Sequence, residues 1–584
     1  MTFRRAVGRE PNGTHFVAER SKRFGFLQLK NPRLAPRGLQ IEWHWADAQP
    51  LAMETRRGVV LIVVLVLVMM VALAGFGFLS AMSTEYEAAR LNGSMRQAQQ
   101  TMASAESTLL WFAALSERDR KIIGGSYHNP ALFRGHVVEP LNEPGTGNPS
   151  TPFSATTPVE QPMNTIEAAV DDRWRFSVVS LDKTPEQNSV LRFGLQNESS
   201  KLNLNNLMRW EQSSPGQGRT SLMQMPGMTE AIADAILDWL DTDDQTREFG
   251  AETEYYQTLD RPYRDANAVP KQLSELLFVK GVTRPLLMGN SSINGDPTQS
   301  LQMQVPSVEA NGDLASDPVA AAGTGWMQYL TLHSAERNQN RQGQPRISLN
   351  STGLAELEQK LTAALPENVV RYIMLARVYG LTLSPGAQSG VEPSAAPFSP
   401  SMVAAFPMKT LADLIDSTVQ VSSATGTIIV QSPLQSSSPD FSTLASSLFD
   451  LTTVHPESVA SGRINLQTAS ETVLRSMPGL TPELVTQIVT QRSTLDATES
   501  GSVVWLLSRN VLDLSTFRRV FPELTMGGDV FQCELIVHRA IGGPMLRRNL
   551  ILDAASTPPR RVYWADLIDS PMPYSKELLL PRVQ

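Results

Sequence analysis

The chain contains one cysteine, Cys533, among 584 residues. An intrachain disulfide is therefore impossible, and the chain must gain its stability from packing or from a bound metal. The seven histidines are scattered, and no two of them have the spacing of a metal-ligand pair. The sequence thus gives no basis for a domain held together by disulfides or zinc.

Positive charge is also in deficit. The sequence has 50 Lys and Arg against 58 Asp and Glu, a formal net charge of −8. A nucleic-acid partner would need a basic face to bind phosphates, so none is expected. The sequence also lacks a Gly-x-Ser-x-Gly turn, a phosphate-binding loop and a His-Glu-x-x-His motif. We therefore expect no enzymatic activity.

No proline occurs between Pro50 and Pro130, which leaves room for one long helix. The run over 59–79 has no charged residue, and about 20 apolar residues can cross a bilayer as a single helix. Arg56 and Arg57 precede this run, whereas the first charges after it are acidic. The positive-inside rule then keeps the N-terminal side in the cytoplasm and exports the C-terminal part.

Helix-forming residues continue from 80 to about 118. Apolar residues recur there at spacings of three and four, which predicts one stripe of an amphipathic helix. We expect a single pilin-like helix over 59–118, transmembrane at 59–79, whose second half packs on a soluble domain. The stripe consists of Met95, Ala98, Met102, Ala105, Leu109 and Phe112.

The residues before the apolar run resemble a type IV prepilin leader. The segment 53–58 is short and basic and ends in glycine, and the apolar run follows directly. The resemblance implies that prepilin peptidase cuts after Gly58 and that the new N-terminus, Val59, is methylated. Val63 stands where most such proteins carry a glutamate, a departure shared by the K component of type II secretion systems. An uncut signal anchor is the alternative.

Residues 1–52 contain Arg and Pro clusters without a sustained period. They would place some fifty residues before a leader that is normally much shorter. We interpret them as the product of a start codon assigned too far upstream, with Met53 as the true beginning. A disordered cytoplasmic extension is the alternative.

Segments near both ends of the remaining chain are predicted to be strands, and those at 174–179 and 191–195 alternate apolar and polar residues, as half-buried strands do. Two lie in 119–200 and three in 526–584. Strands at both ends with helical sequence between them predict an α+β fold, in which a small antiparallel sheet is interrupted by a large inserted helical domain. The predicted strands are 174–179, 191–195, 530–538, 547–552 and 561–564.

The predicted insertion contains a repeated pattern. Met225-Pro226-Gly227 lies in the helical domain 201–283, and Met477-Pro478-Gly479 lies in a second unit, 461–525; a weaker copy spans 346–382. Each full copy predicts a helix, a Pro-Gly turn and a helix capped by threonine, a helix-hairpin-helix pattern. Acidic residues follow both turns, which disfavours DNA binding through them. The stretches 284–345 and 383–460 are rich in Ser, Pro and Gly and predict flexible loops.

A cluster of carboxylates follows the first of these turns. Closely spaced carboxylates repel one another unless a cation lies between them, and oxygen ligands without His or Cys suit Ca²⁺. Asp241, Asp243 and Glu252 match the first, third and twelfth places of an EF-hand loop, but Gln245 and Thr246 do not fit the fifth and sixth. A different calcium loop is therefore predicted, with a solvated acidic loop as the alternative.

The same region resembles type II secretion system protein K. The resemblance rests on Trp-Leu-Asp-Thr-Asp at 239–243, on Gly-Ala-Glu at 250–252 and on a Pro-Tyr pair that follows. It runs from residue 58 to about 283 and resumes over 464–564. It implies that Asp241, Asp243 and Glu252 bind calcium, with Asp244 and Glu248 as weaker candidates.

The resemblance as a whole implies a minor pseudopilin of a type II secretion system. Such a subunit would be held in the inner membrane by one helix, with its C-terminal domain in the periplasm. It would be processed by prepilin peptidase and would cap the pseudopilus tip, with the I and J minor pseudopilins as partners, to serve protein export. A type IV pilus minor pilin and a membrane-anchored helix-hairpin-helix DNA-binding protein are the alternatives.

Overall fold

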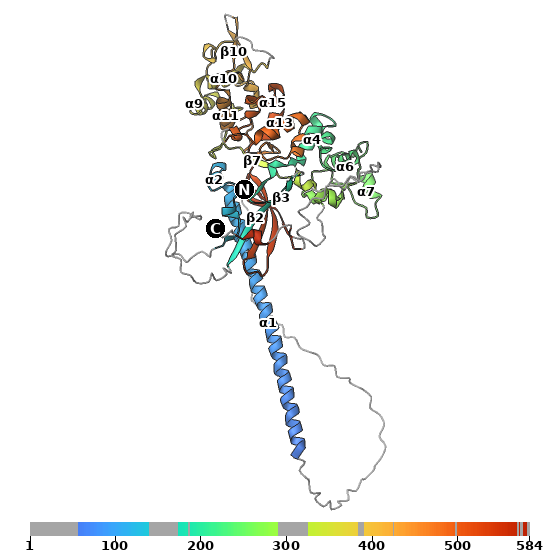
Figure 1. Ribbon diagram of the computed structural model, residues 1–584. Helices are drawn as coiled ribbons and strands as arrows, with labels where there is room; N and C mark the ends of the chain where they lie inside the picture. Colours follow the sequence, from blue (N-terminus) through green and yellow to red (C-terminus); the bar gives the residue numbers. More distant parts are fainter. Residues whose placement is uncertain are drawn as a thin grey trace, which may run out of the picture. The chain divides into compact units, whose positions relative to one another are not determined.

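The computed structural model describes residues 57–138, 173–184, 187–289, 325–383, 390–423, 426–496, 499–568, 572 and 576–580 (Figure 1). They fall into two units, Met1–Met82 and Ser83–Gln584. The predicted extension 1–52 and most of the predicted leader lie outside the described residues.

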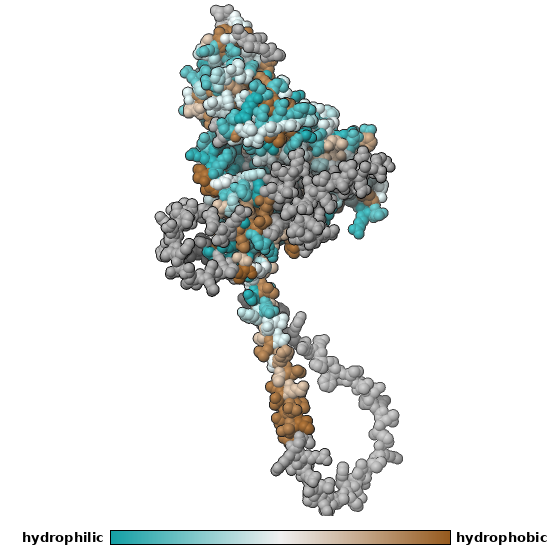
Figure 2. All heavy atoms as spheres, in the orientation of Figure 1, coloured by the Kyte–Doolittle hydropathy of each residue, from teal (hydrophilic) through white to brown (hydrophobic). Residues whose placement is uncertain are grey.

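Helix α1 (Arg57–Ala114) is continuous over 58 residues. In the first unit its described apolar side chains are all exposed, and Figure 2 shows this segment as hydrophobic. A helix that is apolar all round belongs in a nonpolar environment, and this one is long and apolar enough to cross a membrane. It ends four residues before the predicted 118 because Ser116 caps a new helix, α2 (Glu117–Ile122), by accepting a hydrogen bond from the Asp119 amide.

In the second unit, the latter half of α1 packs on an antiparallel sheet. Five of the six predicted stripe residues are buried there, whereas Met95 is 39% exposed. Phe112 meets Phe133 edge to face, with ring centroids 5.1 Å apart. The stripe prediction is therefore confirmed from residue 98 onward.

The sheet joins strands from both ends of the second unit. β2 (Trp174–Thr184) pairs with β15 (Val530–Arg539), which continues through β16 (Leu546–Asp553) to β17 (Arg560–Asp566). Figure 1 shows these C-terminal strands beside the N-terminal ones. The five predicted strands are confirmed, and so is the interruption of one sheet by an insertion. The sheet also contains β1 (His136–Val137), β3 (Gln187–Phe193) and β4 (Gln196–Asn197).

The insertion lies between β4 and β15 and has its own hydrophobic core, separate from that of the sheet. Its helices are short, and its strands pair in twos. The helices are α4 (Leu204–Ser213), α5 (Gln217–Leu222), α6 (Glu230–Leu240), α7 (Thr253–Gln257), α8 (Arg284–Met288), α9 (Leu354–Thr362), α10 (Glu367–Tyr379), α11 (Phe441–Leu451), α12 (Glu471–Arg475), α13 (Pro482–Arg492), α14 (Trp505–Ser508) and α15 (Leu514–Val520). The strand pairs are β5 (Leu202–Asn203) with β6 (Leu330–Thr331), β7 (Ala335–Arg337) with β12 (Val459–Ser461), β8 (Ile347–Ser348) with β11 (Thr452–Thr453), β9 (Thr418–Ser423) with β10 (Gly426–Gln431), and β13 (Ile464–Asn465) with β14 (Leu524–Thr525). Short 3₁₀ helices are η1 (Glu198–Ser200), η2 (Leu273–Phe278), η3 (Trp326–Gln328), η4 (Pro393–Ala395), η5 (Leu411–Leu414), η6 (Glu499–Gly501), η7 (Phe521–Glu523) and η8 (Lys576–Leu579), the last beyond the sheet.

The structure corrects the two predicted flexible loops where it describes them. In 284–345, α8 and η3 are ordered, and fully buried Trp326 donates its Nε1–H to the Pro226 carbonyl at 2.8 Å. In 383–460, the β9–β10 hairpin and α11 contribute Val419, Val421 and Leu448 to the core. Buried apolar residues spaced among Ser, Pro and Gly outweigh the composition of these stretches. Residues 290–324 and 384–389 lie outside the described part.

The predicted hairpins are each a turn between two helices. Thr229 caps α6 by accepting from the Ile232 amide, and Thr481 caps α13 by accepting from the Leu484 amide. Both caps were predicted from the sequence. Membership of the helix-hairpin-helix class remains a prediction.

Candidate functional site

Helix α6 directs three carboxylates toward one loop. Asp234 and Asp238 lie one turn apart, and Asp241 is the C-cap residue, so the three share a side of the helix. Their exposed fractions are 0%, 0% and 8%. Buried carboxylates need hydrogen-bond donors or cations, and the loop at 247–252 supplies the donors.

Backbone amides of this loop hold it against the helix. The Phe249 amide donates to Asp234 Oδ2 at 3.2 Å, and the Ala251 amide donates to Asp238 Oδ2 at 2.9 Å. Gly250 lies between them, and a Cβ atom there would be 1.8 Å from Asp238 Oδ2. A side chain at 250 would therefore push the loop off the helix, which explains the glycine of the Gly-Ala-Glu sequence.

We predict that Gly250→Ala lowers the free energy of unfolding by about 1–3 kcal/mol, the usual cost of forcing an atom into a packed site. Gly353→Ala is the matched control, because its Cβ would meet nothing closer than 3.9 Å. Urea unfolding followed by circular dichroism gives the comparison. Equal stability of the two variants would contradict the close approach at 250.

Two arginines pair with the carboxylates of α6. Arg219 Nε donates to Asp234 Oδ1 at 2.6 Å. Arg247 Nη1 lies 2.6 Å from Asp238 Oδ1 and 2.5 Å from Asp241 Oδ2. One guanidinium thus serves two carboxylates, and the charge of Asp238 and Asp241 is only partly balanced.

Glu252 brings a third carboxylate to Asp238 and Asp241. One oxygen from each of these three buried residues lies within 4.8 Å of the others. Both oxygens of Glu252 and Asp241 Oδ1 are buried and accept no hydrogen bond from the described residues. Unpaired buried oxygens beside one another are costly unless a cation binds them, and hard oxygen donors suit Ca²⁺. The donor set therefore fits the predicted metal.

Two further side-chain oxygens near the acidic loop also lack a hydrogen-bond donor among the described residues. Asp265 Oδ2 and Asn267 Oδ1 are buried without a hydrogen-bond donor among the described residues. Asn267 adopts a positive φ of 42° and donates from Nδ2 to the Asp243 carbonyl at 3.3 Å. The segment 265–267 thus closes over the acidic loop and offers acceptors to it.

The pKa values of the clustered carboxylates also favour a bound cation. Burial raises the pKa of Glu252 to about 9, with further increases from Asp265, Asp238 and Asp241. Burial likewise raises the pKa values of Asp238 and Asp241, although hydrogen bonds from Arg247 oppose it. A proton or a cation must therefore accompany Glu252 at neutral pH.

The predicted ligands separate into two groups in the structure. Asp241 and Glu252 come together, but Asp243, Asp244 and Glu248 are exposed and lie outside the three-carboxylate cluster. Asp243 accepts from the Gln245 amide, Asp244 accepts from Asn267, and Glu248 lies 4.0 Å from Arg219. The sequence reasoning did not choose Asp238, although a spacing of three from Asp241 on a helix places both on one face.

Aromatic side chains next to the acidic loop pack against one another. Trp239 meets Tyr256 edge to face at 5.3 Å, and Tyr256 stacks on Tyr263 at 5.2 Å between ring centroids. The Tyr263 hydroxyl donates to the Phe278 carbonyl at 2.6 Å. These contacts connect α6, α7 and η2, and they account for the tyrosines that follow Glu252.

Comparison with known proteins identifies this part of the chain. Residues 200–288 match the family model described as type II secretion system (T2SS), protein K. The chain carries a protein K domain. This match confirms the resemblance found in the sequence, and it covers α6, the acidic loop and all three clustered carboxylates.

The protein K domain lies within a longer likeness to a solved structure. The chain is similar to the crystal structure of the GspK-GspI-GspJ complex from the type 2 secretion system of enterotoxigenic Escherichia coli, with 11% sequence identity and a TM-score of 0.33. The likeness covers 82% of this chain and 98% of the matched chain. A search of curated proteins finds no match.

Proposed function

We propose that this chain is a minor pseudopilin of a type II secretion system. The observation that carries the proposal is the match of residues 200–288 to protein K. It agrees with the apolar first part of α1 and with a sheet that packs on the later part of this helix. In this role the protein acts as a structural subunit rather than as an enzyme.

The subunit caps the tip of the pseudopilus together with the I and J minor pseudopilins. The protein matched at low identity was solved as a complex of GspK, GspI and GspJ, which motivates this choice of partners. The insertion from η1 to β14 adds a second hydrophobic core to the pilin-like sheet. A head of this bulk would prevent another subunit from stacking above it. Until assembly, α1 anchors the protein in inner-membrane lipid with its head in the periplasm.

Residues 238–252 bind Ca²⁺ in this proposal. Asp238, Asp241 and Glu252 hold the ion, and Asp265, which interacts with Glu252, offers a further oxygen. The ion supplies the positive charge that Arg247 does not, and it holds the acidic loop on α6. In a chain with one cysteine, such a site takes the structural role of a disulfide.

Mass spectrometry of the membrane fraction tests the pseudopilin proposal. We expect the mature chain to begin at an N-methylated Val59, and Gly58→Val to abolish the cut by placing a branched side chain at the cleaved bond. Gly75→Ala, whose Cβ would meet nothing within 4 Å, should leave the mature N-terminus unchanged. An uncut wild-type chain would overturn the assignment as a pseudopilin.

The phenotype of a deletion strain distinguishes a role in type II secretion from a role in a type IV pilus. If the extracellular proteome loses exported enzymes and regains them on complementation, the chain serves secretion. A defect confined to surface pili would instead make it a minor pilin of a type IV pilus. Salt-dependent DNA binding by the purified chain would favour the third reading, a membrane-anchored DNA-binding protein.

A further inference from the structure

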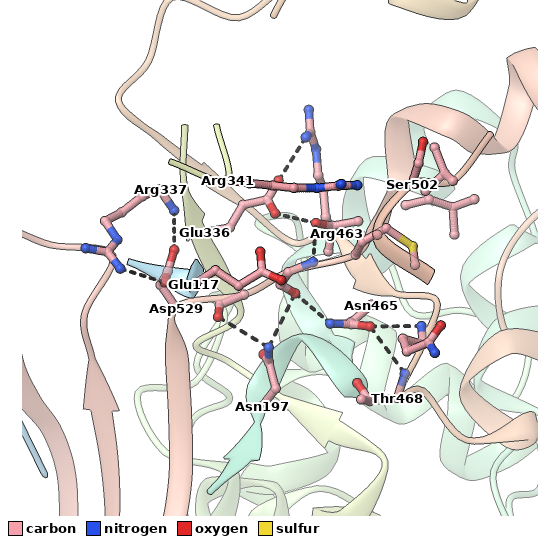
Figure 3. A pocket seen from close by; sticks show the side chains of 18 of the residues that line it. Glu117, Asn197, Glu336, Arg337, Arg341, Arg463, Asn465, Thr468, Ser502 and Asp529 are labelled. Atoms are coloured by element: carbon pink, nitrogen blue, oxygen red, sulfur yellow. Dashed lines mark hydrogen bonds and ion pairs between the residues drawn. The ribbon is translucent and has the colours of Figure 1, made fainter. Parts of the chain in front are cut away.

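A large cavity lies in the second unit between the sheet and the insertion. Its volume is about 960 Å³, and it is lined by β4 and the start of β15 on one side and by parts of the insertion on the other. Figure 3 shows Arg337 turned onto Asp529 and Arg341 extended toward Ser502. A volume of this size lies at the upper end of the range for ligand cavities, about 300–1,000 Å³.

The charge of this cavity is opposite to that of the chain. Nine Lys and Arg line it against four Asp and Glu, whereas the whole chain carries a net charge of −8. Charge of one sign around a concave, partly enclosed space concentrates the field and attracts ligands of opposite charge. The excess therefore favours an anion.

The acidic residues of the lining mostly have cationic partners already. Asp529 Oδ1 lies 3.0 Å from both Arg120 Nη2 and Arg337 Nη2. Glu336 Oε1 lies 2.9 Å from Arg463 Nη1, and Glu117 pairs with Lys121. These pairs build the wall of the cavity and leave few carboxylates to compensate the remaining cations.

Four of the remaining lining cations have no carboxylate partner among the described residues. Arg346 donates from Nε to the Asp450 carbonyl at 3.1 Å, and Arg492 donates from Nη1 to the Leu466 and Ala469 carbonyls. The Arg341 guanidinium and the Lys409 ammonium make no hydrogen bond or ion pair within the described part. Guanidinium and ammonium groups bind oxyanions in preference to carbonyl oxygens, so each of these four cations can donate hydrogen bonds to a carboxylate.

Gln467 adds a requirement that a simple anion does not meet. This residue lines the cavity, and its buried Oε1 accepts no hydrogen bond from the described residues. A ligand that satisfied it would need N–H or O–H donors as well as negative charge. The cations also come from separate segments, 341–346, 409 and 492, rather than from one point.

We propose that this cavity binds an acidic peptide segment of another polypeptide. Spaced carboxylates would reach the separated cations, and backbone amides would supply donors to groups such as Gln467. A single inorganic ion would meet only one or two of the cations and would leave most of the volume empty. The binding does not depend on the metal site or on the role in secretion.

Calorimetric titration of the full chain in detergent with an end-blocked tetraglutamate peptide tests the proposal. We expect tetraglutamate to bind and tetraglutamine not to bind. The double variant Arg341→Gln, Lys409→Gln should weaken binding about tenfold, because two charged contacts of the ligand are lost. Thermal melting of each variant establishes that it remains folded.

The matched control is Lys271→Gln with Arg284→Gln, which removes the same charges from exposed positions that do not line the cavity. It should bind tetraglutamate like the unaltered chain. Equal losses in the two double variants would mean nonspecific attraction and would overturn the proposal. So would the absence of binding, or displacement of the peptide by an equal concentration of inorganic phosphate, which would assign the cavity to a small oxyanion.

Discussion

Chelation of calcium is expected to lower the melting temperature of the full chain in detergent by an amount on the order of 5 °C, and Glu252→Gln is expected to remove this response. A ligand at about 100 times its dissociation constant stabilises the folded state by about 2.7 kcal/mol, which sets the size of the shift. Glu252 is the decisive position because both of its oxygens are buried without donors among the described residues.

The same site predicts a pH dependence. Without calcium, the pKa of Glu252 is raised to about 9, above the value of about 4.3 for an unfolded chain. A raised pKa stabilises the folded state fully below the unfolded value, and this contribution is lost as pH rises toward 9. Calcium must displace the proton on Glu252, so its stabilising effect should be larger at pH 8 than at pH 6. Melting curves with calcium or EDTA at both values provide the measurement.

Asp243→Asn is the matched control, because Asp243 is exposed and lies outside the cluster of three carboxylates. Its melting temperature should still respond to calcium. If Asp243→Asn lost the response, Asp243 would belong to the ligand set, as the EF-hand-like spacing predicts, and the buried cluster of Asp238, Asp241 and Glu252 would not account for the site. No effect of EDTA on the unaltered chain would contradict a structural metal altogether.

Local sequence patterns predicted the elements that repeat a simple period. The stripe from Ala98 to Phe112 follows from burial of one helix face, and the apolar run at 530–538 predicted the strand β15; the structure confirms both. The acidic loop was also visible, because Gly-Ala-Glu and the preceding Trp-Leu-Asp are contiguous in the chain. Interactions between neighbours in sequence are the ones that a sequence shows directly.

The β9–β10 hairpin was missed for a different reason. Val419, Val421 and Val430 are buried, but they are embedded in a stretch whose average composition is that of a loop. Each strand is short, and its stability comes from packing on helices such as α10 rather than from its own pattern. A prediction based on composition over long windows cannot detect such strands.

The basic cavity could not have been predicted, because its cations come from segments far apart in the chain. Arg341, Lys409 and Arg492 stand near no common motif, and only folding brings them to one cavity. The overall net charge of −8 conceals them. The net charge of the whole chain argues against a basic surface on average, but it gives no information about the charge of one concave site.

Asp529→Asn is expected to lower the free energy of unfolding by about 3–5 kcal/mol, because it removes one partner of a buried ion network and leaves two guanidinium groups uncompensated. Arg120 and Arg337 both contact Asp529 Oδ1 at 3.0 Å. The same arginines donate to the Ala113, Ala114 and Leu115 carbonyls at the end of α1. One carboxylate thereby connects the end of α1, strand β7 of the insertion and the start of β15.

Asp440→Asn is the matched control for urea unfolding, because Asp440 is exposed and makes no ion pair among the described residues. The free energy of unfolding of this variant should equal that of the unaltered chain. Burial raises the pKa of Asp529, but Arg120 and Arg337 outweigh it and lower the pKa below its usual value. A lowered pKa stabilises the folded state above about pH 4 and is lost as pH falls through the folded value. The variant should therefore lose part of the acid sensitivity of the unaltered chain. Equal stability of Asp529→Asn and Asp440→Asn would contradict a stabilising role of this ion network.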